Sequence, residues 1–106
     1  MLIERDSEGY LVNPDDWNEE CAQILADEEN LGLNQDVWIV LRFMRSYYDE
    51  HKIAPDIRHV AKYLADQKTW DKHQAKEYLF QLFPYGYVKQ ACKIAGMKRP
   101  RAWSTG

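Results

Sequence analysis

The chain has 106 residues, of which 45% are hydrophobic and 13% aromatic, and its formal net charge is -3. This length suits one domain, and the apolar content can form a hydrophobic core, which excludes an intrinsically disordered chain. No stretch approaches the ~20 apolar residues that span a bilayer, and the acidic N-terminus lacks the apolar segment of a signal peptide. We therefore expect a cytoplasmic protein without a membrane span, with one domain at residues 1–96 and an arm at 97–106.

The N-terminal segment, at about residues 2–12, has the pattern of two short strands. Apolar residues on either side flank the sequence Asp6-Ser7-Glu8-Gly9. Its polar residues favour a turn, and its glycine accepts a positive φ angle. The segment therefore predicts a β-hairpin at the start of the domain.

Helical spacing of apolar residues begins directly after the predicted hairpin. We expect the first helix to start at Asn13, because asparagine is a favoured N-cap and Pro14 suits the first turn. The expected inward stripe of this helix consists of Trp17, Cys21, Ile24 and Leu25.

Four further helices follow from capping residues and apolar spacing. Asn34 and Asp56 are the expected N-caps of the second and third helices, and Thr69 is expected to open the fourth. A fifth helix is predicted from about 87 to 95, with Gly96 suited to the left-handed position after its end. The predicted fold is α+β but mostly α: a small helical bundle with an N-terminal β-hairpin and a mobile C-terminal arm.

Charge is distributed very unevenly along the chain. Residues 1–50 contain 13 Asp or Glu and 3 Lys or Arg, a balance of -10, whereas residues 51–106 contain 4 and 11, a balance of +7. Two interpretations stay open. The two halves complement each other within the fold, or the basic half meets an acidic protein or a phosphate backbone.

Cys92 is the candidate nucleophile. Lys89 and Lys93 lie within about one helical turn of it, and nearby cations lower the pKa of a thiol and favour the reactive thiolate. The alternative is ordinary packing, because Cys92 also falls on an apolar stripe of the fifth helix. Cys21, in an acidic segment, is expected to be a core residue. Without a CxxC motif, and with scattered histidines, the sequence predicts neither a metal site nor a cofactor.

The C-terminal arm combines basic residues with one large aromatic side chain. Arg99, Arg101 and Trp103 are candidate binding residues, together with the two lysines beside Cys92. Trp103 either anchors the arm to a partner or folds back onto its own domain. Basic residues beside an aromatic ring also suit nucleic acid.

A long run near the C-terminus resembles a known family. The segment from Tyr78 to Pro100 is similar to the C-terminal signature of the DsrC/TusE family. Shorter matches occur upstream in the same order, at Glu8-Gly9-Tyr10-Leu11, Asp16-Trp17, Trp38 with Val40, Phe43-Met44-Arg45 and Pro55-Asp56-Ile57-Arg58. The resemblance covers nearly the whole chain.

The resemblance implies a helical bundle with an N-terminal β-hairpin and a mobile C-terminal arm, in agreement with the elements above. It also implies sulfur trafficking. Members of this family carry sulfane sulfur on cysteines of the arm, either with dissimilatory sulfite reductase or in the relay that supplies sulfur for tRNA thiolation. The implied partners are proteins, with tRNA involved only indirectly, and the implied activity is that of a sulfurtransferase that acts as a sulfur carrier.

One departure from the family pattern affects the expected chemistry. Cys92 matches the inner arm cysteine of the family, but the position of the penultimate carrier cysteine is occupied by Trp103. One arm cysteine cannot form the intramolecular disulfide of relatives that have two. Two functions therefore stay open, persulfide relay through Cys92 and docking on sulfur-metabolism partners as a non-catalytic regulator. Nucleic-acid binding is a third, more remote alternative.

Overall fold

A computed structural model gives the fold of the chain and describes residues 3–99. Within this range the α-helices are α1 (Glu19–Glu28), α2 (Gln35–His51), α3 (Ile57–Lys68) and α4 (Lys72–Leu82). A 3-10 helix at Pro14–Asp16 precedes them, and a π-helix at Tyr87–Cys92 follows them. No helix in the described part of the chain is long and apolar enough to cross a membrane.

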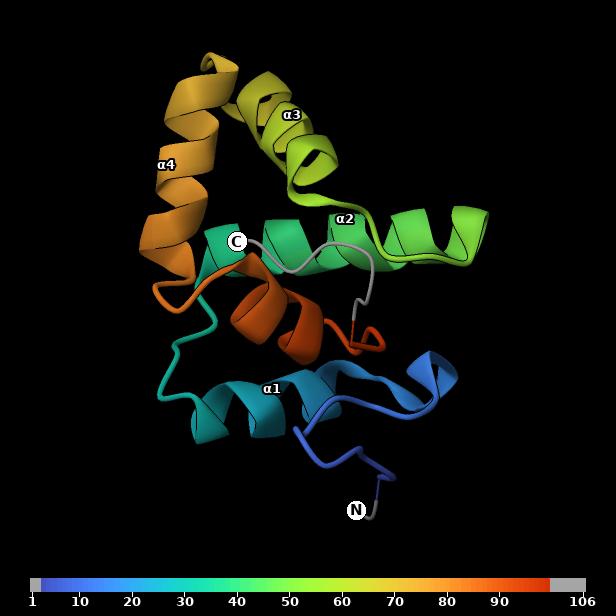
Figure 1. The fold of residues 1–106 in the computed structure, drawn as a ribbon. Coiled ribbons are helices and arrows are strands. Elements are labelled where there is room, and N and C mark those ends of the chain that lie inside the picture. Colours follow the sequence, from blue (N-terminus) through green and yellow to red (C-terminus); the bar gives the residue numbers. More distant parts are fainter. Residues whose placement is uncertain (1–2, 100–106) are drawn as a thin grey trace.

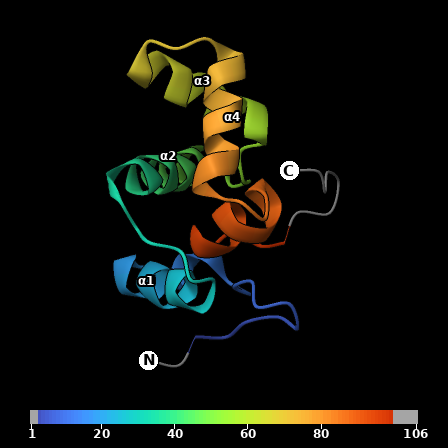
Figure 2. The same ribbon diagram turned by 90° about the vertical axis from the view of Figure 1, so that its left-hand side faces the viewer.

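The π-helix and the turn after it lie in the middle of the molecule. Figures 1 and 2 show this terminal helical segment between α2 on one side and α1 on the other. The pair formed by α3 and α4 packs together on the far side of α2 from α1 (Figure 1). The segment that contains Cys92 is therefore enclosed by the rest of the fold.

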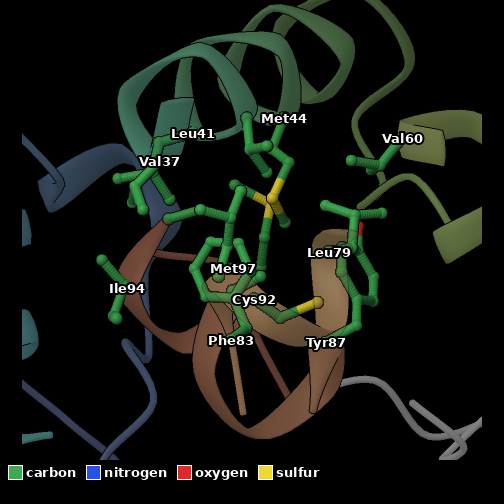
Figure 3. Packing of buried hydrophobic residues seen from close by; sticks show 14 of the residues in the cluster. Val37, Leu41, Met44, Val60, Leu79, Phe83, Tyr87, Cys92, Ile94 and Met97 are labelled. Carbon is green, nitrogen blue, oxygen red and sulfur yellow. The ribbon is translucent and has the colours of Figure 1, made fainter. Parts of the chain in front are cut away.

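The hydrophobic core gathers around this terminal segment. Figure 3 shows side chains of α2, α3 and α4 converging on it. The core residues labelled in the figure are all at most 2% exposed: Val37, Leu41, Met44, Val60, Leu79, Phe83, Tyr87, Cys92, Ile94 and Met97. Because burial of one large aliphatic side chain contributes about 1.5–3 kcal/mol, this packing holds the terminal segment firmly in place.

Polar side chains cap the helices where the sequence predicts it for α2 and α3. The Asn34 carboxamide accepts a hydrogen bond from the Val37 amide at 2.9 Å, and Asp56 accepts one from the Arg58 amide at 2.9 Å. Such bonds satisfy amide groups that the first helical turn leaves without an internal partner. The two predicted caps are confirmed.

The N-terminal β-hairpin is the first expectation that the structure corrects. Among residues 3–12 the only ladder contact is an isolated antiparallel bridge between Arg5 and Leu11. Two backbone hydrogen bonds, from the Asp6 amide to the Tyr10 carbonyl at 2.8 Å and from the Val12 amide to the Glu4 carbonyl at 3.1 Å, flank this bridge. The Asp6 carboxylate also accepts hydrogen bonds from the amides of Glu8 and Tyr10, which closes the turn. The segment then turns Leu11 into the core instead of continuing as a strand. The mostly helical fold is confirmed, without the hairpin.

The first helix also begins later than the sequence suggests. Asn13 caps only the short 3-10 helix, and the backbone is extended again at Trp17 (φ -73°, ψ 142°). Asn18 is the N-cap of α1, where its side chain accepts a hydrogen bond from the Cys21 amide. The buried face of α1 consists of Cys21, Ala22, Leu25 and Ala26, so that Ile24, which is 39% exposed, does not belong to the inward stripe.

The fourth helix begins two residues after the predicted position. Thr69 is the left-handed residue that ends α3 (φ 59°), and Asp71 is the N-cap of α4. Asp71 accepts a hydrogen bond from the Gln74 amide at 2.8 Å, and the Gln74 side chain accepts one from the Asp71 amide at 3.2 Å. This reciprocal pair is a capping box, which a threonine two positions earlier does not provide.

Replacement of Asp71 by alanine should lower the free energy of unfolding by about 1 kcal/mol, because the first turn of α4 loses its cap. Urea denaturation followed by circular dichroism measures the change. Asp66→Ala removes the same charge from the exposed face of α3 and is the control. Equal losses for the two variants would contradict a specific capping role for Asp71.

Candidate functional site

The thiol of Cys92 is completely buried inside the fold. Figure 3 shows its sulfur atom directed toward the side chain of Tyr87, one turn earlier in the same π-helix. The Tyr87 hydroxyl donates a hydrogen bond to the Pro55 carbonyl at 2.5 Å, which ties the π-helix to the start of α3. The π-helix is a rare form that occurs frequently at functional sites.

The pKa of the Cys92 thiol differs from the one expected from the sequence. Burial raises the pKa of the Cys92 thiol from 9.0 to about 12, and the neighbouring Tyr87 hydroxyl acts in the opposite direction without overcoming it. The prediction that nearby lysines lower this pKa is therefore wrong. Loss of hydration disfavours the thiolate more than any nearby group stabilises it. In the closed fold Cys92 is a neutral thiol at physiological pH.

The two lysines that flank Cys92 point elsewhere. Lys89 is exposed to solvent. Lys93 is directed toward Glu29, with an Nζ–Oε2 distance of 3.7 Å, and its Nζ lies 5.2 Å from the centre of the Tyr10 ring. Lys93 therefore contributes to the attachment of the terminal segment to α1 and does not act on the thiol.

The end of the terminal helical segment is held by two side chains from distant parts of the sequence. The Trp17 indole donates a hydrogen bond to the Ile94 carbonyl at 2.8 Å. The Arg45 guanidinium donates to the carbonyls of Ala95, at 3.1 Å, and Pro14, at 3.0 Å. We call Trp17 and Arg45 the clamp. Because carbonyls at a helix end lack internal partners, the clamp satisfies groups that would otherwise need water.

The clamp depends on close packing around its own side chains. The Arg45 guanidinium lies 4.7 Å from the centre of the Trp17 ring and 5.5 Å from that of Tyr48. Burial lowers the pKa of Arg45. The side chain nevertheless stays charged, because a guanidinium is not deprotonated in proteins. The clamp therefore places a desolvated cation against the negative end of the helix dipole.

Gly96 ends the helical segment in the left-handed conformation that the sequence predicts. Its φ angle is +78°, and the amide of Met97 donates to the Cys92 carbonyl at 3.0 Å. A Cβ atom at Gly96 would lie 2.4 Å from Cδ1 of Trp17. Glycine is therefore required both by the turn and by the approach of the clamp.

The described part of the arm leaves the fold beside the N-terminal turn. Arg99 forms a salt bridge with Glu8 at 2.7 Å. A cavity of about 570 Å³ lies at this point and is lined by Asp6, Leu11, Val12, Lys98 and Arg99. Of the remaining predicted binding residues, Arg101 and Trp103 lie outside the described residues.

The second cysteine, Cys21, lies in a different element from Cys92. Cys21 is buried in α1, as the sequence predicts, and burial raises the pKa of its thiol too. Among residues 3–99, no three His, Cys, Asp or Glu side chains gather as a set of metal ligands. Both thiols of the described residues are therefore enclosed, and only that of Cys92 lies in the segment that the clamp holds.

Comparison with known proteins identifies the family. The family model described as "DsrC like protein" matches residues 1–102. The chain belongs to the DsrC family. Sulfurtransferase TusE of Yersinia pseudotuberculosis is 42% identical over 93% of this chain and 91% of its own length. Sulfurtransferase TusE of Escherichia coli K12 is 41% identical over 92% of this chain and 89% of its own length.

Solved structures of the DsrC family have the same fold. The oxidized gamma-subunit of the dissimilatory sulfite reductase (DsrC) from Archaeoglobus fulgidus superposes with a TM-score of 0.84, at 28% identity over 96% of this chain and 92% of that one. Allochromatium vinosum DsrC gives a TM-score of 0.80 at 38% identity, over 96% of this chain and 90% of that one. The resemblance derived from the sequence is confirmed.

Sequence reasoning placed Trp17 in the core and assigned no role in the site to Trp17, Arg45 or Tyr87. Trp17 and Arg45 occur in motifs that the DsrC family resemblance includes, and Tyr87 lies in its C-terminal run. The role of Trp17 follows from its contact with Ile94, which lies 77 positions away in the sequence. The role of Arg45 follows from its contact with Ala95, which lies 50 positions away. Spacing within one helix cannot indicate such contacts.

Proposed function

We propose that this protein is a cytoplasmic sulfur-relay protein that accepts sulfane sulfur on Cys92 and delivers it to a partner protein. The observation that carries the proposal is the 42% identity, over 93% of the chain, to a protein named sulfurtransferase. Cys92 supports it, because this is the cysteine nearest the arm in the sequence. The partners are proteins of sulfur metabolism, and tRNA takes part only through them.

The proposed transfer is a thiol–persulfide exchange. The Cys92 thiolate attacks the outer sulfur of a donor persulfide, a new S–S bond forms at Cys92, and the S–S bond of the donor breaks. The donor leaves as a thiolate, which takes up the proton that Cys92 gave up. One sulfur atom moves and no net oxidation occurs, so the exchange needs neither a metal nor an organic cofactor.

Burial of Cys92 sets a condition on this chemistry. A thiol with no exposed surface and a pKa of about 12 does not react from the closed fold. The proposed exchange therefore occurs when residues 87–97 open locally and the thiol regains water. Partner docking that loosens the contacts of Trp17 or Arg45 with the helix end would promote this opening.

A docking role without sulfur transfer is the second candidate, and the burial of Cys92 is the observation that favours it. In this alternative the arm, with Arg99, Arg101 and Trp103, binds a sulfur-metabolism partner and regulates it. Cys92 then acts only as a core residue.

Incubation with a small-molecule polysulfide donor should add one sulfur atom to the wild-type protein, and peptide mass analysis should place it on Cys92. Cys92→Ser should abolish the adduct, whereas Cys21→Ser, the matched control at the other buried thiol, should retain it. Wild-type protein that acquires no adduct, even in mild urea, would refute the relay proposal and favour docking.

A further inference from the structure

A basic groove lies between α3 and α4, which pack against each other at the end of the molecule farthest from α1 (Figures 1 and 2). Its volume is about 450 Å³. The residues that line it are Arg58, His59, Ala61, Lys62, Lys72 and Lys76. This set contains no carboxylate. The groove is therefore a positively charged surface on a protein whose net charge is negative.

The positively charged side chains of this groove are close enough to repel one another. Arg58 and Lys62 are four residues apart on α3, and Lys72 and Lys76 are four residues apart on α4. Like charges at this spacing lie on the same helical face and destabilise the helix. Two such pairs also face one groove from opposite sides. A bound anion would relieve the repulsion between these cations.

Internal carboxylates neutralise only one side of the groove. Asp56 binds Arg58 at 2.9 Å and His59 at 3.1 Å. Lys62, Lys72 and Lys76 have no salt-bridge partner among residues 3–99. By contrast, Lys68 of α3 is paired with Asp36 at 2.9 Å. Three ammonium groups of the groove are thus available to an anionic ligand.

We propose that the groove between α3 and α4 is a docking surface for an acidic segment of a partner protein. A row of Glu or Asp side chains laid along the two helices would meet lysines from both sides and relieve their repulsion. This charge complementarity fixes orientation and speeds association. The interaction is exposed and therefore sensitive to salt.

Charge on the rest of the molecule favours a short acidic segment over a nucleic acid. Residues 1–50 have a balance of -10, and the molecule measures only 40 × 27 × 22 Å. A polyanion long enough to run from the groove along the molecule would come within the screening length of about 8–10 Å of acidic side chains in this half and would be repelled there. A segment confined to the groove avoids that repulsion.

This inference goes beyond the proposed function and does not depend on Cys92. None of the groove residues contributes to the clamp, and the lysines of the groove make no salt bridge with the terminal helical segment. Docking at the groove and sulfur chemistry at the thiol are therefore separable, so that failure of one does not imply failure of the other.

The test uses a fluorescein-labelled peptide of alternating glutamate and alanine, as long as α4, with fluorescence anisotropy at low salt. The wild-type protein should bind this peptide, and addition of salt should weaken the binding. Lys62→Glu and Lys76→Glu should each raise the dissociation constant about fivefold. Arg42→Glu makes an equal change of charge at an exposed residue of α2 outside the groove, and it should leave the dissociation constant within about twofold.

Three results would overturn the proposal. The first is that the peptide does not bind at low salt, and the second is that the groove variants and Arg42→Glu lose the same amount of peptide affinity. The third is that a labelled oligouridine of equal length binds more tightly than the peptide through the same lysines. Persulfide formation on Cys92 in Lys62→Glu is measured in parallel. A retained adduct with lost peptide binding supports the groove as an independent surface, and a wild-type protein that binds the peptide without any adduct supports the groove alone.

Discussion

In the folded protein at pH 8, Cys92 should react with iodoacetamide at least roughly a thousandfold more slowly than in the urea-unfolded chain. Only the thiolate is alkylated, and burial raises the pKa of this thiol from 9.0 to about 12. Three pKa units reduce the thiolate fraction by roughly a thousandfold at this pH. Complete burial adds a steric barrier to the reagent.

The measurement is quenched alkylation followed by peptide mass analysis, which separates Cys92 from Cys21. Cys21 is also buried with a raised pKa and serves as the internal comparison. A native rate at Cys92 within tenfold of the unfolded rate would contradict the closed site. Sub-denaturing urea then distinguishes local from global opening, because a locally opened segment exposes Cys92 before Cys21 reacts.

The same pKa shift predicts how stability depends on alkaline pH. A thiol whose folded pKa exceeds its unfolded pKa stabilises the fold fully below pH 9, where both states keep the proton. This contribution decreases as the pH rises from about 9 to about 12, because the unfolded chain then loses the proton more readily. Because of Cys92, the free energy of unfolding should therefore be lower in strongly alkaline solution than at neutral pH.

Local signals in the sequence predict the starts of α2 and α3 correctly. Asn34 and Asp56 are short polar residues ahead of apolar periodicity, and each caps a helix as expected. Gly96 has the positive φ expected of a residue just past a helix end. In each case the determining interaction lies within about four residues, so that the sequence alone contains the necessary information.

The predictions that fail depend on competition between local alternatives or on distant residues. Thr69 and Asp71 are both plausible caps, and the reciprocal bonds with Gln74 decide for Asp71. At Cys92 the flanking lysines suggest a lowered pKa, but the side chains that surround the thiol come from α2, α3 and α4. Neighbours in sequence report little about the dielectric environment of a buried group.

Replacement of Gly96 by alanine should lower the free energy of unfolding by about 3 kcal/mol. Alanine at φ +78° is strained by about 1–2 kcal/mol, and its Cβ would lie 2.4 Å from Cδ1 of Trp17, which adds the cost of overpacking. A shift of the indole ring that relieves this contact would disturb the hydrogen bond from Trp17 to the Ile94 carbonyl. Urea denaturation followed by far-UV circular dichroism measures the change.

Gly32→Ala is the matched control, because a Cβ atom at Gly32 would meet no other atom within 4 Å and the residue has no positive φ angle. This substitution should be neutral or stabilise by up to about 1 kcal/mol, through lower entropy of the unfolded chain. Comparable destabilisation by the two substitutions would contradict the special position of Gly96.

The Gly96 variant also tests how the clamp governs access to Cys92. If Trp17 and Arg45 hold residues 87–97 closed, Gly96→Ala should accelerate alkylation of Cys92 by about a hundredfold, which corresponds to about 3 kcal/mol at roughly 1.36 kcal/mol per factor of ten. Alkylation of Cys21 should rise less, because its helix α1 does not end at the clamp. Equal acceleration at both cysteines would mean that Cys92 becomes reactive only through global unfolding. In that case residues 87–97 would not open separately from the rest of the fold. A relay protein would then need its partner to expose the thiol.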